Sequence, residues 1–283
     1  MEHAYAELPL AAFSTLASIG AGVFVALALA IPGGLFSSSP EKLKKIDRLT
    51  AIPVLLVGVG FIAAMFHLAT PLNALNALNG VGRSPLTNEV VVGLAFMVVA
   101  LAYWVAALTG RLGLGVRKAL VSVLAVLAVF FAGFIGLAYA IPTIPTWNTP
   151  FAPASMLGYC LLGGSLFGLL ILQAADVLKD VASGSFKVLF VALGLLGAAA
   201  AVIGTLGLFM VAGGIEAAGH QVAAALPWLV GSIAGLVLSL ALAVISVVRV
   251  PRLGVVALGC LVVLCSVFVG RLVFYALYIT VGV

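Results

Sequence analysis

The chain has 283 residues, of which 65% are hydrophobic and only 7% are charged. A soluble globular domain carries roughly 25% charged residues, so this composition excludes an ordinary water-exposed surface. The formal charge of +5 is the balance of 13 basic and 8 acidic residues, and the basic residues, most of them in short loops, form no basic face for nucleic acid. We therefore expect a single polytopic membrane domain over residues 1–283.

The amino-terminal segment Met1 to Glu7 is acidic and lacks the positive region that begins a signal peptide. The apolar run that follows is longer than the core of a signal peptide. We therefore expect a retained first transmembrane helix. The three cysteines lie inside apolar runs without C-x-x-C spacing, so we expect neither a disulfide framework nor a metal site.

Eight apolar runs are each long enough to cross the hydrocarbon layer, which takes about 20 residues of helix. They are separated by clusters of proline, glycine and polar residues, and they lack the alternation of barrel strands. The sequence predicts an all-α integral membrane protein with eight transmembrane helices. Their ranges are 8–31, 49–69, 89–109, 117–141, 151–178, 186–213, 225–248 and 253–279.

Most of the basic residues fall in the connections after the odd-numbered helices. Loops rich in lysine and arginine usually stay in the cytoplasm. We therefore expect these connections to be cytoplasmic and both termini to be periplasmic. The basic residues concerned are Lys42, Lys44, Lys45, Arg48, Arg111, Arg117, Lys118, Lys179, Lys187, Arg249 and Arg252.

Small residues recur at four-residue spacing in two of the helices, at Gly164 and Gly168 and at Gly231 and Gly235. Such pairs let helix backbones approach closely in lipid, so we expect helix contacts at both.

Three further features, at or near the helix ends, have structural explanations. Asp176 is expected to pair with Lys179 or Lys187, and Trp147 to act as an anchor at the membrane interface. Leucine and asparagine alternate with short periods within residues 70–88, which favours a re-entrant or interfacial helix.

Ionisable residues inside a membrane protein are costly, so each is a candidate functional group. His67 ends the second helix, Glu89 begins the third, and Arg271 lies about 27 Å up the eighth, so all three reach a similar depth. Tyr275 and Tyr278 follow Arg271 on the same helical stripe. Oxidation of a quinol releases two protons with two electrons, and histidine is a natural proton acceptor near neutral pH. We predict a quinol site in which His67 and Glu89 are catalytic and bind quinol together with Arg271 and Tyr275.

A purely structural explanation of these residues stays open. In it, Glu89 favours its helix amino terminus by about 0.3–1 kcal/mol, His67 is a hydrogen-bonded interfacial residue, and Arg271 pairs with Glu89. Haem is not expected, because bis-histidine ligation needs two histidines at matching depth. Of the other two histidines, His3 and His220, each lies in a short segment outside the predicted helices.

Several short segments, in order along almost the whole sequence, resemble the membrane-anchor subunit (DmsC family) of anaerobic dimethyl sulfoxide reductases. Two departures concern loop geometry, with Ala69 where the family usually has glycine and Pro85 where an apolar or aromatic residue is common. The similar segments are 7–10, 61–63, 67–71, 76–82, 84, 86, 88–89, 145–147, 270–271, 274–275 and 280–282.

This resemblance implies a bacterial inner-membrane subunit that oxidises menaquinol without haem in anaerobic respiration. It implies two partners, an iron–sulfur electron-transfer subunit and a molybdopterin catalytic subunit, on the periplasmic face. Iron–sulfur clusters and molybdopterin would belong to these partners, and the chain itself would not act on the terminal substrate. The family's quinol-site histidine and glutamate correspond to His67 and Glu89.

Two other functions remain as alternatives. A secondary transporter would favour charges at the midplane, broken helices and inverted repeats. Another type of quinone-interacting subunit with its own proton pathway would need buried acids across the membrane.

Overall fold

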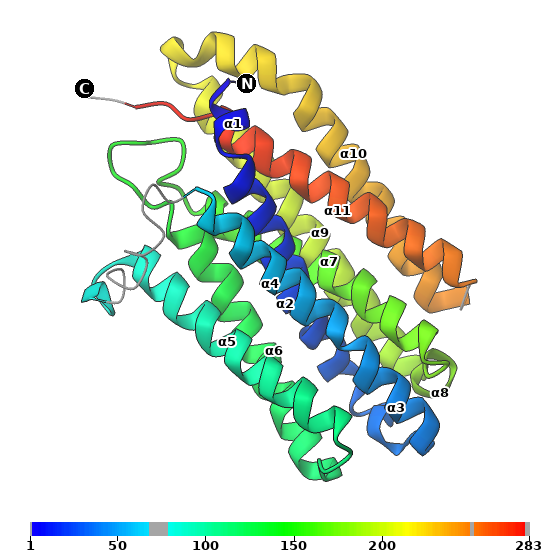
Figure 1. Ribbon diagram of the computed structural model, residues 1–283. Coiled ribbons are helices and arrows are strands. Elements are labelled where there is room, and N and C mark those ends of the chain that lie inside the picture. Colours follow the sequence, from blue (N-terminus) through cyan, green and yellow to red (C-terminus); the bar gives the residue numbers. More distant parts are fainter. Residues whose placement is uncertain (1, 68–78, 250–251, 281–283) are drawn as a thin grey trace.

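The computed structural model describes residues 2–67, 79–249 and 252–280 (Figure 1). Every regular element in these ranges is helical, and eight helices are long and apolar enough to cross a membrane. This confirms the predicted all-α architecture. The long helices are α2 (Leu8–Ala30), α4 (Ala51–Met65), α5 (Pro85–Leu108), α6 (Leu114–Leu137), α7 (Phe151–Ala174), α9 (Gly184–Gly213), α10 (Gly219–Arg249) and α11 (Leu253–Ala276).

Shorter elements sit at the helix ends. The amphipathic helix α3 (Pro40–Leu49) leads directly into α4 and is counted with it as one span. The remaining short elements are α1 (Glu2–Ala6), η1 (Leu35–Ser37), α8 (Leu178–Val181) and η3 (Glu216–Ala218).

Serine caps explain why two helices begin earlier than the hydropathy predicts. The hydroxyl of Ser84 accepts a hydrogen bond from the amide of Thr87 at 3.4 Å, and Pro85 occupies the first helical position. The third predicted helix therefore begins at Pro85, and Glu89 lies one turn inside it. Ser183 caps α9 in the same way through the amide of Phe186, at 3.3 Å.

The interfacial helix predicted within residues 70–88 falls largely outside the described residues. Residues 79–84 form a turn, with the amides of Arg83 and Ser84 both bonded to the carbonyl of Gly80. The last residues of the predicted segment belong to α5.

Helices α2 and α7 form the centre of the bundle and most of their residues are buried, whereas fewer than half of the residues are buried in the apolar part of each of the other six long helices. A β-carbon added at Gly164 of α7 would lie 2.1 Å from the carbonyl carbon of Gly22 in α2. One added at Gly168 would lie 2.4 Å from the β-carbon of Ala26. The predicted close contact at Gly164 and Gly168 is therefore confirmed.

Helix α10 packs chiefly against α11 and α9 (Figure 1). A β-carbon at Gly235 would lie 2.0 Å from the hydroxyl of Ser266 in α11, but one at Gly231 would meet nothing within 4 Å. The predicted contact is confirmed at Gly235 and wrong at Gly231, because Gly231 points away from the neighbouring helix and is exposed.

The two ends of the bundle differ in the elements and in the basic residues that they hold. The terminal end holds α1, the ends of α4 and α11 and the start of α5, whereas the basic end holds α3, α8 and the end of α10 (Figure 1). The basic connections predicted to be cytoplasmic all lie at the basic end.

Acidic residues compensate part of this positive charge. Lys42 bonds to Asp180 at 2.5 Å, and Lys45 bonds to Asp176 at 2.8 Å. The hydrogen bond from the Lys45 ammonium holds the pKa of Asp176 below its ordinary value. The predicted pairing of Asp176 with Lys179 or Lys187 is therefore wrong, since the turn before α8 brings Asp176 to α3 instead.

Candidate functional site

His67 meets a carboxylate at the terminal end of the bundle. It lies two residues after α4, and its Nδ1 atom is 3.0 Å from Oε2 of Glu7, the residue that precedes α2. The Nε2 atom of His3, in α1, lies 4.0 Å from the other carboxylate oxygen of Glu7. The Glu7 side chain is only 15% exposed, whereas that of His67 is 39% exposed. The carboxylate is therefore held between two imidazoles, and the His67 ring remains accessible.

Arg271 is a buried cation at the same end. Its side chain is 1% exposed, and its guanidinium donates from Nε to the Ser14 hydroxyl at 2.7 Å and from Nη2 to the Tyr275 hydroxyl at 3.0 Å. The Tyr275 hydroxyl is also hydrogen-bonded to that of Tyr139. The guanidinium carbon lies 4.1 Å from the centre of the Phe274 ring, which adds a cation–π contact.

Glu89 is buried on the inward stripe of α5. It lies one turn before Gly93, where an added β-carbon would collide with Phe131 and Phe61. Glu89 is within electrostatic reach of Arg271 and Tyr139.

The site contains a carboxylate that the sequence reasoning did not assign to it. In the described ranges, no hydrogen bond or ion pair joins Glu89 to His67 or to Arg271, so the Arg271–Glu89 pair of the purely structural explanation is not observed. The carboxylate that contacts His67 is Glu7. Its position directly before the Leu8–Pro9 start of the first long helix was the available signal, because that start fixes Glu7 at the end of the bundle.

Helix α2 links the His67–Glu7 pair to the Arg271 cluster. Glu7 and Ser14 are seven residues apart, which places them on one helical face about 10 Å apart along the axis. The His67–Glu7 pair and the Arg271 cluster therefore lie along one side of α2. Beside His67, the surface is apolar, with Ile62, Met65 and Phe66 all exposed and Phe66 the most exposed, at 80%.

Aromatic rings pack beside the Arg271 cluster at the terminal end. The His3 ring stacks on Tyr278 at 4.2 Å. Trp147 is 7% exposed, stacks on Phe274 and donates from Nε1 to the Phe274 carbonyl at 3.0 Å. The expectation that Trp147 anchors the protein at the membrane interface is therefore wrong, since its indole N–H is satisfied inside the protein.

Two pockets lie at the basic end of the bundle. One, of about 400 Å³, lies between α3 and the turn joining α5 to α6, and the other, of about 340 Å³, lies between η1 and Asp180. Within the described ranges, no group of three histidine, cysteine, aspartate or glutamate side chains is arranged to hold a metal ion.

The fold and these residues define a multi-pass membrane protein with ionisable groups gathered at one end. The family model for the DMSO reductase anchor subunit (DmsC) matches residues 1–277, so the chain belongs to the DMSO reductase anchor subunit family. This confirms the resemblance noted in the sequence.

Known proteins are similar to this one over 60–100% of its length. The protein is 30% identical to the YnfH subunit of anaerobic dimethyl sulfoxide reductase from Escherichia coli (strain K12), over 100% of this protein and 98% of the relative. It is 36% identical to the C subunit of anaerobic dimethyl sulfoxide reductase from the same organism, over 60% of this protein and 59% of the relative. The C subunit of the enzyme from Haemophilus influenzae (strain ATCC 51907 / DSM 11121 / KW20 / Rd) is 27% identical, over 98% and 96%.

Family membership defines the role of the protein at a coarse level. It is a membrane anchor of a DMSO reductase-type complex in anaerobic respiration. Such a complex implies a catalytic subunit and an iron–sulfur subunit as partners. Membership favours this role over the secondary transporter considered from the sequence.

Proposed function

We propose that the protein binds and oxidises menaquinol at the terminal end of the bundle and passes the electrons to the iron–sulfur subunit. His67 and Glu89 are the catalytic residues, and Arg271 and Tyr275 bind the quinol with them. The observation that supports this most directly is the His67–Glu7 pair beside a lipid-facing surface. A quinol can present its head group to His67 while its apolar tail stays against Ile62 and Phe66.

The Glu7 carboxylate orients His67 for proton transfer. Because Nδ1 lies 3.0 Å from a carboxylate, we assign the proton of the neutral imidazole to this nitrogen. The Nε2 atom is then the free acceptor, and it takes the proton from a quinol hydroxyl. The negative charge of Glu7 stabilises the imidazolium that this transfer forms.

The Arg271 cluster acts on the quinol oxygen. A buried guanidinium held by Ser14 and Tyr275 is a fixed positive charge in a medium of low polarity. Such a preorganised charge stabilises the negative charge that develops on an oxygen as its proton leaves. Glu89, within electrostatic reach of Arg271, accepts the second proton.

The complete reaction converts one quinol to one quinone, two protons and two electrons. The protons leave at the terminal end, which we place in the periplasm, and the protein lies in the bacterial inner membrane. The electrons pass without haem to an iron–sulfur cluster of the partner docked at that end. Reduction of the terminal substrate takes place at the molybdopterin in the catalytic subunit.

The proposal is tested by His67→Ala in the complete complex. Quinol-dependent reductase activity is expected to fall about 100-fold or more, the range for loss of a general base. Activity with an artificial dye donor should persist, because the dye bypasses the anchor. His220→Ala is the matched control, since His220 is exposed in the first turn of α10 at the same end. Quinol-dependent activity retained by His67→Ala would reject the assignment.

A further inference from the structure

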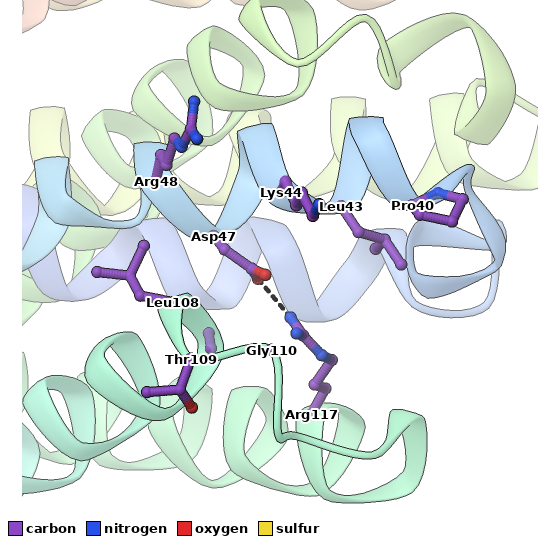
Figure 2. A pocket seen from close by; sticks show the side chains of 10 residues that line it. Pro40, Leu43, Lys44, Asp47, Arg48, Leu108, Thr109, Gly110 and Arg117 are labelled. Carbon is purple, nitrogen blue, oxygen red and sulfur yellow. Dashed lines mark hydrogen bonds and ion pairs between the residues drawn. The ribbon is translucent and has the colours of Figure 1, made fainter.

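A pocket at the basic end has no part in the proposed quinol reaction. It is a cavity of about 400 Å³ between α3 and the turn that joins α5 to α6 (Figure 2). Asp47 of α3 points across it to the guanidinium of Arg117 in α6 (Figure 2). The lining residues that matter here are Lys44, Asp47, Arg48, Leu108, Thr109 and Arg117.

The pocket has a rigid polar base. Arg117 and Asp47 are both buried and form an ion pair, and Arg117 also donates from Nε to the carbonyl of Leu112 at 3.2 Å. A buried pair of this kind is stable only where both charges are compensated. The charge of Asp47 is therefore already neutralised by Arg117.

Two cations of α3 remain without an acidic partner. Lys42 and Lys45 pair with Asp180 and Asp176, on the side of α3 that faces α7 and α8. Lys44 and Arg48 are one turn apart, are exposed and line the pocket, and no ion pair within the described ranges includes either. The pocket therefore carries an excess positive charge on groups free to bind an anion.

The surface next to the pocket is apolar. Leu101, Val105 and Leu108 are all exposed, and their spacing places them on one stripe of α5 that runs from the pocket toward the bilayer centre. In a membrane-spanning helix, such a stripe faces acyl chains. An anion bound at Lys44 and Arg48 would thus lie at head-group depth, with apolar surface beneath it.

We propose that this pocket binds the phosphate of an anionic phospholipid, with Lys44 and Arg48 contacting the phosphate and the acyl chains along Leu108 and Val105. Basic pockets at the ends of transmembrane helices bind lipid head groups through this combination of charge and apolar surface. Free phosphate shares the anionic group but gains nothing from the apolar stripe. A phospholipid is therefore the favoured source of the phosphate.

The test measures lipid retention by the purified complex that contains this protein. The complex is exchanged into nanodiscs of dioleoylphosphatidylcholine with increasing dioleoylphosphatidylglycerol, and the bound anionic lipid is counted by native mass spectrometry. Wild type should retain phosphatidylglycerol, and K44Q/R48Q should bind it about 10-fold or more weakly. K44R/R48K should retain binding, because it keeps both charges.

Matched controls distinguish lipid binding in the pocket from attraction by general surface charge. R249Q/R252Q removes two exposed charges at the same end of the bundle, and its phosphatidylglycerol binding should equal that of wild type. An equal loss in this control would overturn the proposal. Millimolar inorganic phosphate that displaces the lipid completely would assign the pocket to a free ion instead. Unchanged binding in K44Q/R48Q, with its thermal midpoint in phosphatidylcholine also unchanged, would likewise overturn it.

Discussion

Glu7 is more buried than its place near the amino terminus implies. Its carboxylate lies between His67 and His3, and His3 is itself stacked on Tyr278. A carboxylate that contacts an imidazole fixes which ring nitrogen carries the proton. In the proposed reaction, Glu7 is therefore a positioning residue, which acts on the quinol through His67.

This role predicts the effect of Glu7→Gln. Glutamine keeps the shape of the side chain but loses the negative charge that lies beside the His67 ring, so the imidazolium formed by proton transfer is less stabilised. We expect the quinol-dependent rate to fall about 10-fold, equivalent to about 1.4 kcal/mol of transition-state stabilisation. Dye-driven activity should not change.

Glu216→Gln is the control for Glu7→Gln. Glu216 is an exposed acid in η3 at the same end of the bundle, so its loss changes the local charge without changing a contact of His67. An equal loss in both variants would show that general surface charge matters and that the His67 contact does not.

The sequence identifies His67 as a residue of the terminal end because hydropathy places it where the second helix stops. It does not identify Glu7 as its partner. Periodicity defines the faces of one helix, whereas this contact depends on how α1 and α2 lie against the end of α4. For the same reason the sequence predicts Arg117 to be a basic residue of a loop, although the structure buries it against Asp47.

At the scale of the element, α10 carries two glycines four residues apart in different surroundings. Gly235 faces Ser266 of α11, and Gly231 faces no other helix. The spacing predicts a contact at both, but α10 is an outer helix and has a neighbour on only part of its circumference. In the central helix α7, which is surrounded, both Gly164 and Gly168 are packed.

These surroundings predict different outcomes for two similar substitutions. Gly235→Val forces side-chain atoms into the α10–α11 contact, and such overpacking costs typically about 1–3 kcal/mol. Gly231→Val places the same side chain where there is space. We expect a lower thermal midpoint for Gly235→Val than for Gly231→Val in the detergent-solubilised complex. Equal midpoints would contradict the close packing at Gly235.

At the scale of the whole molecule, the two ends of the bundle differ in chemistry. The terminal end holds the buried Arg271, the Glu7 and Glu89 carboxylates and the three histidines, and the basic end holds most of the lysines and arginines. Length and hydropathy alone predict the eight helices, because a helix in lipid must satisfy its backbone internally. Which helices lie side by side depends on packing among small residues. Because such residues recur in almost every helix, the sequence pattern does not predict the neighbours.

The distribution of charge predicts how the bundle sits in the membrane. Loops rich in lysine and arginine remain in the cytoplasm, so the basic end should be cytoplasmic and the terminal end periplasmic. This is tested by labelling single cysteines with a membrane-impermeant maleimide, after Cys160, Cys260 and Cys265 have been replaced by alanine. Glu216→Cys and Arg111→Cys place thiols at exposed positions of the terminal and basic ends.

We expect Glu216→Cys to be labelled in spheroplasts and Arg111→Cys only in inverted membrane vesicles. The reverse pattern would place the terminal end in the cytoplasm. Protons from the quinol would then leave on the cytoplasmic side, and the iron–sulfur subunit would have to dock there. The orientation therefore decides on which side of the membrane the two quinol protons are released and on which side the partner subunits dock.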